Sequence, residues 1–375
     1  MTKSGSRRIP LTRPETDEAE VERVAAVLSS GHLTQGPVVE EFEEQVGDLV
    51  GCRHAVATTS ATTALHLSLA ALGIGPGDEV LVADFTFPAT ANVVVQQGAT
   101  PVLVDIDPST FAIDPKDLAD RVNARSKAII PVHPFGLSAD LDPILRIAAQ
   151  HDLAVVEDAA CALGADYRGR PVGSLGVVGC FSFHPRKSIT TGEGGVIVTD
   201  DDRLAERLRL LRSHGGRREE RRFRFDDAGY NYRLSDILAA VGVAQLPKLR
   251  GFVERRRALA DRYHKLLGGV DDVGLPGDTE WGRHIYQSYV LMLPDRVDRD
   301  DVIRRLSTVG VETTLGTYAL HDEPFFARTY GYKPNDLPNA HAAYRKTLTL
   351  PLFPSMSWAD QDYVVEQLLG LISRL

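Results

Sequence analysis

Two side chains that could act on one cofactor stand where strand-like runs of the sequence end. Lys187 closes the segment Phe181-Ser-Phe-His-Pro-Arg-Lys187, in a polar loop before a glycine-rich turn. Asp158 lies 29 residues earlier, at the end of the apolar run Val155-Val-Glu-Asp158. A lysine amine can form a Schiff base with an aldehyde, and a carboxylate can keep a pyridine nitrogen protonated. The pair predicts a pyridoxal phosphate site, with both residues catalytic.

Other candidate residues could hold the phosphate and the ring. Ala61 and Thr62 fall where a strand turns into a helix, and helix N-terminal amides bind phosphate. The same turn could also be a plain helix cap. Ser182 offers a further hydroxyl. Phe87 could stack on the pyridine ring or belong to ordinary core packing.

Candidates for substrate binding are less distinctive. His133 follows a strand-like run, and Glu193 follows Gly192 in the lysine loop. Each could contact substrate, and each could equally serve only local structure. The three cysteines lack the spacing of a metal site or of a disulfide framework, so no metal is expected.

The pattern of apolar runs predicts how these residues are positioned. Strand-like and helical segments alternate from about residue 54 to residue 215, which predicts a mostly parallel sheet with helices on both faces, a three-layer α/β sandwich. Ligands bind such sheets at the carboxyl ends of the strands, where most candidates fall. The expected strands are 54–58, 79–84, 100–105, 127–133, 153–158, 179–183 and 196–200, and the expected helices 62–72, 89–97 and 140–151.

The pattern changes after residue 236. A long helix over 236–267, kinked or broken at Pro247, is expected first. A Gly/Asp/Pro-rich stretch then leads to a strand over 287–293 and helices over 300–309 and 359–373. A further helix is expected over 15–28. We therefore predict a large cofactor-binding domain over 1–250 and a smaller C-terminal α+β domain over 251–375.

Composition excludes several classes of protein. The 375 residues carry a formal charge of −9, which argues against a general nucleic-acid binder. No apolar run is long enough to cross a membrane, and the N-terminal residues do not form a signal peptide. With only three scattered cysteines, we expect a cytoplasmic protein. The arginine-rich run 217–224 is either a solvated loop or a site for a phosphorylated substrate.

The motifs together resemble the DegT-type nucleotide-sugar aminotransferases, which are fold type I pyridoxal phosphate enzymes with an aspartate aminotransferase-like fold. The resemblance runs nearly end to end. It rests on Thr34-Gln-Gly-Pro37, Glu157-Asp-Ala-Ala160, the segment from Phe181 to Lys187, Thr191-Gly-Glu-Gly-Gly195, Gly229-Tyr-Asn-Tyr-Arg-Leu-Ser-Asp236 and Leu350-Pro-Leu-Phe-Pro354.

The resemblance assigns roles to individual residues. Lys187 and Asp158 match the residues that bond the cofactor and its ring nitrogen, and Ala61, Thr62, Ser182 and Phe87 match positions around its phosphate and ring. Asn231 resembles an asparagine that reaches the other protomer's phosphate, which implies a homodimer with shared active sites. Tyr318 and His321 fall in a loop near the sugar pocket.

The chain departs from the family pattern at three positions. Ala61 stands where a glycine is usual, and Cys161 and Leu163 replace a glutamine and a histidine. The glutamine commonly bonds the cofactor's phenolic oxygen, so Cys161 falls at a cofactor contact. A thiol is a weak hydrogen-bond donor, which puts that contact in question.

The activity that the resemblance implies is transfer of an amino group, from L-glutamate, to a keto-sugar linked to a nucleotide. Related alternatives are a sugar dehydratase, which Lys187 argues against because that branch carries histidine there, an aminotransferase for a keto-cyclitol such as an inosose, and an aromatizing aminoshikimate-type enzyme. A non-catalytic sensor that binds the cofactor is an alternative of another class.

Overall fold

A seven-stranded sheet forms the centre of the protein, for which a computed structural model describes residues 7–219 and 222–372. The strand order is β1-β10-β9-β6-β5-β2-β4. β10 runs antiparallel to both of its neighbours, and the remaining pairs are parallel. The strands are β1 His54–Thr58, β2 Glu79–Ala83, β4 Thr100–Val104, β5 Ser126–Ile130, β6 Ala154–Asp158, β9 Val178–Ser182 and β10 Gly195–Thr199.

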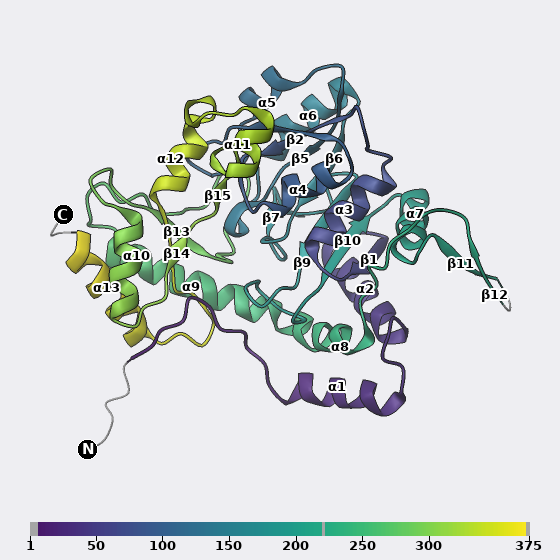
Figure 1. Cartoon of the computed structure of the whole chain (residues 1–375). Coiled ribbons are helices and arrows are strands. Elements are labelled where there is room, and N and C mark those ends of the chain that lie inside the picture. Colours follow the sequence, from purple (N-terminus) through teal and green to yellow (C-terminus); the bar gives the residue numbers. More distant parts are fainter. Residues whose placement is uncertain (1–6, 220–221, 373–375) are drawn as a thin grey trace.

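Helices cover both faces of this sheet (Figure 1). The helices α3 Ala61–Ala71, α4 Ala89–Gln96 and α7 Asp202–Arg212 pack on one face. The other face carries α2 Pro37–Val50, α5 Pro115–Arg121, α6 Leu141–His151 and α8 Asp236–Gln245. Because apolar side chains on both faces of the strands are buried, the strands read as nearly continuous apolar runs. The predicted three-layer α/β sandwich is confirmed.

Proline ends two elements where the sequence suggested a break. β5 ends at Ile130, before Pro131, which has no amide hydrogen to give to a ladder. Downstream, Pro247 lies in a single 3-10 turn that separates α8 from α9 Leu249–Leu267. The expected long helix is therefore two helices in sequence.

A second hydrophobic core forms around a small antiparallel sheet of order β13-β16-β14, with β13 Tyr289–Met292, β14 Thr314–Leu315 and β16 Thr347–Leu350. α9, α10 Arg299–Thr308 and α13 Trp358–Ile372 pack against it. Ile9 also belongs to this core and pairs with Val311. Ile9 is thus built into the C-terminal unit, while the domain division at residue 250 stays a prediction.

Three further helices pack outside the sheets, and two of them contribute side chains to the core of the large sheet. α1 Glu18–Ser30 begins at a capping box made by Asp17 and Glu20 and packs on α8. α11 Pro324–Tyr330 and α12 Pro338–Lys346 lie beside the large sheet, near β4 and β15 Tyr318–Ala319. None of the described helices combines the length and apolar character needed to cross a lipid bilayer.

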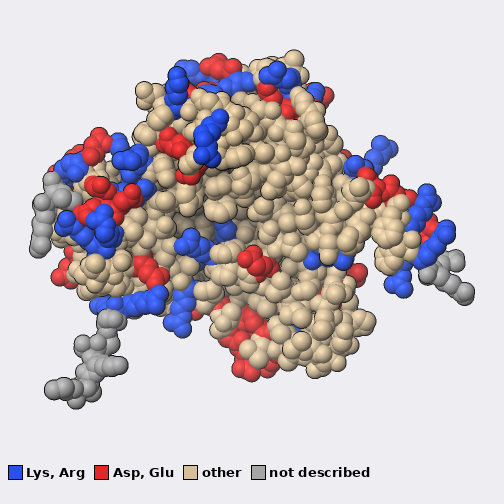
Figure 2. Space-filling view, in the orientation of Figure 1, with Lys and Arg blue, Asp and Glu red and all other residues tan. Residues whose placement is uncertain are grey.

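The arginine-rich run forms a hairpin that projects from the body of the protein (Figure 1). Its strands are β11 Gly216–Glu219 and β12 Arg222–Phe225, and the intervening Glu220 and Arg221 lie outside the described residues. Basic and acidic side chains mix along it (Figure 2). Arg224 contacts Asp226 at 2.7 Å, so part of the positive charge is neutralised locally. Phe223 and Phe225 are exposed on it.

Candidate active site

A cavity of about 510 Å³ opens where the carboxyl ends of the central strands face the small sheet. Its lining combines the turn after β1, the ends of β6 and β9, and residues from β14 and β16. Of the residues predicted from sequence, the cavity brings together Ala61, Thr62, Phe87, Asp158, Cys161, Ser182, Lys187 and Glu193.

The loop that carries Lys187 is closed by backbone hydrogen bonds. Phe183 N–H donates to Gly194 O at 2.9 Å, and Thr191 N–H donates to Phe183 O at 3.0 Å. Gly192 has φ +86°, a backbone conformation that favours glycine. The loop therefore holds the half-buried Lys187 at the cavity, where its Nζ donates to Cys161 Sγ at 3.0 Å.

Asp158 lies at the floor of the cavity, at the end of β6. It accepts hydrogen bonds from Thr90 Oγ1 at 2.8 Å and from Ala160 N–H at 3.2 Å. Burial raises the pKa of the Asp158 carboxyl, and these two bonds do not fully offset it. A buried carboxylate with so few donors gains from a cationic or N–H partner in the cavity.

The turn after β1 leaves donors free at the N-terminus of α3. Ser60 caps the helix by accepting from Thr63 N–H at 3.2 Å. The amides of Ala61 and Thr62 have no hydrogen-bond partner among the described residues. Ala61 is already helical, so no glycine-like conformation is needed there. At Gly195, which packs on this turn, a Cβ would meet Ser60 O at 2.3 Å.

Phe87 stands out among the aromatic residues of the site because 65% of it is exposed. It follows β3 Phe85–Thr86 and lines the cavity. Its ring lies edge-on to Tyr318, with centroids 6.4 Å apart. Ordinary core packing does not describe this position, and its ring faces are available to a ligand.

His133 and His321 are buried and do not line the cavity. His133 Nε2 lies 3.0 Å from Glu157 Oε2, and its Nδ1 accepts from Ala139 N–H at 3.0 Å. His321 Nδ1 lies 2.6 Å from Asp84 Oδ2. Because neither side chain reaches the lining, the structure does not bring His133 or His321 together with the other predicted site residues.

Three other predicted residues stand at different distances from the cavity. Glu193 lines it with an exposed side chain. Tyr318 is outside the lining but touches its wall through Phe87. Asn231 is exposed and bridges to Ser213, away from the lining of its own chain.

The structure adds residues that the sequence did not single out. Thr90 is the direct partner of Asp158, and Gln287 Nε2 donates to Arg186 O at 2.6 Å, beside the lysine. A hydroxyl-bearing wall comes from Thr314, Thr317 and Thr349. Thr90 follows Phe87 by about one helical turn, so its spacing from Phe87 in the sequence could have marked it as a site residue. The wall threonines reach the cavity only through tertiary packing, so no local pattern marks them.

These groups fit pyridoxal phosphate. An amine and a buried, under-partnered carboxylate line one cavity, together with free amides suited to a phosphate. A model of the DegT/DnrJ/EryC1/StrS aminotransferase family matches residues 14–369. The chain belongs to this family. It is a pyridoxal phosphate-dependent sugar aminotransferase, as the resemblance implied.

Individual relatives agree along nearly the whole chain. GDP-perosamine synthase of Caulobacter vibrioides is 41% identical over 365 residues, covering 96% of this chain and 97% of the relative. The spore coat polysaccharide biosynthesis protein SpsC of Bacillus subtilis is 39% identical over 377 residues, covering 97% of each.

A solved structure gives the same fold with the cofactor in two states. Spr1654 of Streptococcus pneumoniae, named as a sugar aminotransferase, is 28% identical to this chain and has been solved in PLP and PMP forms. The PMP form has a TM-score of 0.94 and covers 98% of both chains. The PLP form has a TM-score of 0.93 and covers 98% of this chain and 99% of the other.

Proposed function

We propose that this family member moves the amino group of L-glutamate onto the keto carbon of a nucleotide-linked keto-deoxysugar. In the net exchange, glutamate becomes 2-oxoglutarate, and the sugar gains the amine in place of its keto oxygen. The observation that carries the proposal is the single cavity shared by the Lys187 amine, the Asp158 carboxylate and the free amides of α3. The name of the relative GDP-perosamine synthase supports a nucleotide-linked amino sugar as product.

Lys187 and Asp158 carry the reaction in this proposal. When bound, pyridoxal phosphate supplies an aldehyde for an amino group and a ring that withdraws electrons from the neighbouring carbon. Lys187 anchors the cofactor through Nζ, and the same amine, once released, takes and returns the proton. Asp158 accepts a charge-assisted hydrogen bond from the ring nitrogen, which fits its shortage of other donors.

The remaining predicted contacts hold the cofactor in place. The amides of Ala61 and Thr62 and the hydroxyl of Ser182 bind the phosphate, and Phe87 covers the ring. Cys161, 3.0 Å from Lys187 Nζ, lies beside the reacting end of the cofactor.

The substrate side of the cavity has both charged and neutral hydroxyl-bearing groups. Arg186 and His184 are exposed and line the opening, where they suit the phosphates of a nucleotide. The threonine wall suits the hydroxyls of a sugar ring, and Glu193 stands at the same opening. Tyr318 contributes by supporting Phe87.

The proposal includes a homodimer in the cytosol. Asn231 is exposed and does not line the cavity of its own chain, which suits a contact with the cofactor phosphate of a second protomer. Mixing Lys187→Ala and Asn231→Ala protomers should restore part of the activity if the sites are shared. Verified mixed dimers without activity would contradict the shared site.

The first experiment is a visible absorption spectrum of the purified protein with pyridoxal phosphate, before and after L-glutamate. We expect a yellow band that fades toward the pyridoxamine form, with Lys187→Ala as the control that lacks the starting band. The protein in its pyridoxamine form is then mixed with nucleotide keto-sugars and, in a parallel reaction, with an inosose. Turnover of the inosose alone would assign the enzyme to cyclitols, and a band that ignores every amino donor would favour a sensor.

A further inference from the structure

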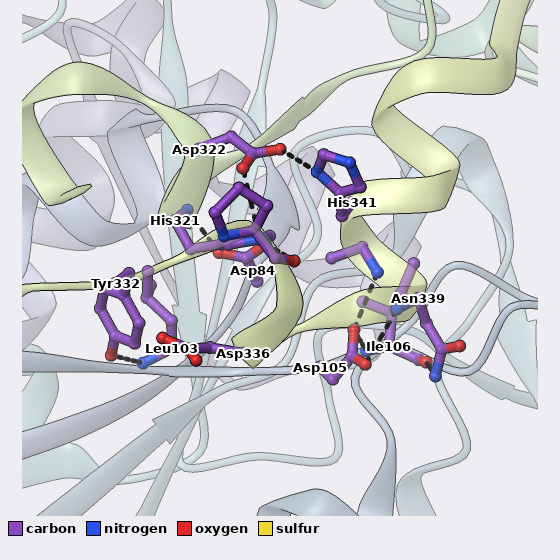
Figure 3. Close-up of polar contacts among 12 residues, drawn as sticks. Asp84, Leu103, Asp105, Ile106, His321, Asp322, Tyr332, Asp336, Asn339 and His341 are labelled. Atoms are coloured by element: carbon purple, nitrogen blue, oxygen red, sulfur yellow. Dashed lines mark hydrogen bonds and ion pairs between the residues drawn. The ribbon is translucent and has the colours of Figure 1, made fainter.

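Among the described residues, two histidines and an aspartate gather outside the cofactor cavity. His321 and Asp322 lie in the 3-10 turn η3 Leu320–Asp322, and His341 lies in α12 (Figure 3). One ligand atom from each of the three lies within 4.8 Å of the others. None of the three lines the cofactor cavity, and the proposed aminotransferase reaction uses none of this geometry.

One separation within the cluster matches the spacing of two ligands on a single ion. Asp322 Oδ1 and His321 Nε2 lie 3.6 Å apart, beyond the usual range of an N–H···O bond. Two ligands that each lie about 2.1 Å from a tetrahedral zinc ion are roughly 3.4 Å apart. The other carboxylate oxygen, Oδ2, lies 2.6 Å from His341 Nδ1, a contact in which an ion would replace the shared proton.

A second carboxylate fixes the orientation of the buried ligand. Asp84 Oδ2 lies 2.6 Å from His321 Nδ1, and Asp84 Oδ1 accepts from the His321 backbone N–H at 2.8 Å. Both side chains are fully buried. A histidine that ligates a metal through one nitrogen typically donates its other N–H to a carboxylate. Asp84 therefore directs Nε2 of His321 toward Asp322.

The cluster is open on one side. The His341 side chain is 37% exposed and the Asp322 side chain is 13% exposed, so an ion has a route from solvent. The Pro334 carbonyl oxygen lies 3.3 Å from His321 Nε2 and offers an additional oxygen. Two imidazoles and one carboxylate form a ligand set that suits zinc and neighbouring divalent transition metals.

We propose that His321, Asp322 and His341 bind a divalent transition-metal ion, with Zn²⁺ as the best match. The ion joins η3 to α12 at a point directly behind the wall of the active site. β15 pairs with β3, and Leu320 N–H donates to Asp84 O at 3.1 Å. Because Thr86 and Phe87 line the cavity, the ion stabilises the position of that wall and takes no part in the chemistry.

The test measures metal binding by the intact holoenzyme. Protein stripped with a chelator and dialysed is titrated with Zn²⁺, and bound zinc is counted by elemental analysis. We expect about one tight equivalent per chain and a raised melting temperature. Co²⁺ in place of Zn²⁺ should give visible bands beyond the cofactor absorption that report nitrogen and oxygen ligands.

Variants connect the binding to the cluster. His341→Ala should weaken zinc binding at least tenfold, and the matched control His32→Ala, which removes an exposed histidine from a loop, should leave it unchanged. Asp322→Asn gives a second variant if His341→Ala folds poorly. Wild-type protein that binds no tight equivalent, or a folded His341→Ala that binds zinc like wild type, would overturn the proposal. Cofactor binding and half-reaction spectra report separately on the aminotransferase function.

Discussion

Glu157 and Asp158 are adjacent carboxylates in β6, and they differ in the number of hydrogen bonds that their side chains accept. Glu157 faces a loop, where it accepts from His133 and from the amides of Gly173, Leu175 and Gly176 at 2.6 to 3.0 Å. Asp158 faces the cavity on the other side of the sheet and has only two donors among the residues that the structure describes. The alternation of side chains along a strand places these neighbours in separate environments.

The difference appears in their acidity. Burial alone would raise the pKa of Glu157, but the hydrogen bonds from His133 and from the amides outweigh it, and the pKa lies below its usual value. Burial dominates at Asp158, and the pKa of that carboxyl is raised. A buried carboxylate with a full set of partners serves the fold, whereas one that lacks partners is held ready for a ligand.

The largest effect should come from the residue opposite Asp158. Lys187→Ala removes both the cofactor anchor and the proton carrier, so turnover of a keto-sugar should fall by roughly 10⁴-fold or more. Because Lys187 is half-buried at a cavity, the fold should persist, as checked by circular dichroism. Substantial turnover by the folded variant would remove Lys187 from the mechanism.

Asp158→Asn should lower turnover but raise the melting temperature of the cofactor-free protein. Losing the charged partner of the ring should lower turnover by about 100-fold or more. In the cofactor-free protein at neutral pH, however, the melting temperature should rise, because a buried carboxylate with too few donors becomes a neutral amide. A lower melting temperature would show that the fold needs this charge.

Glu157→Gln should lower the stability of the protein and leave its turnover nearly unchanged. The amide cannot accept from every donor that the carboxylate satisfies, so the free energy of unfolding should fall by about 3 kcal/mol. Turnover per folded molecule should stay close to wild type, since Glu157 does not line the cavity. Chemical unfolding with parallel activity assays measures both quantities, and a selective loss of turnover would contradict the comparison.

The smallest effect should be a pH dependence of opposite sign at the two positions. The contribution of Glu157 is present above the ordinary pKa of 4.5 and is lost as the pH falls through its lower folded value. The penalty at Asp158 is absent below the ordinary value of 3.8 and develops as the pH rises through its raised folded value. Melting curves of the cofactor-free wild type, Glu157→Gln and Asp158→Asn from pH 3 to pH 8 should show both trends, and parallel curves would refute the assignment.

Sequence patterns predicted the large sheet well because its strands are apolar on both faces. They placed Asp158 at a strand end and Lys187 in a loop between two strands, and both residues line the cavity. They could not separate His133 from these residues, because its partner Glu157 lies 24 residues away and the buried pair forms only on folding. The exposure of the Phe87 ring could not be predicted from the sequence either, because exposure depends on how the rest of the chain packs around the ring.

The C-terminal contribution to the site was the least predictable. Thr314 and Thr349 lie on strands of two and four residues whose position depends on the second core, and Thr317 lies in the loop after the first of these strands. The pairing of His321 with Asp84 spans 237 residues. Cys161 could be placed beside the cofactor lysine only through the family resemblance, and the contact with Lys187 gives it a physical partner.

The pairing of Ile9 with Val311 has a consequence for synthesis of the protein. Ile9 leaves the ribosome some 300 residues before its partner, and its core also needs α13. Leu11 and Thr12, which follow Ile9, line the cavity together with Thr349 and Leu350. A nascent chain therefore lacks part of the cavity wall until Thr349 and Leu350 have been synthesised.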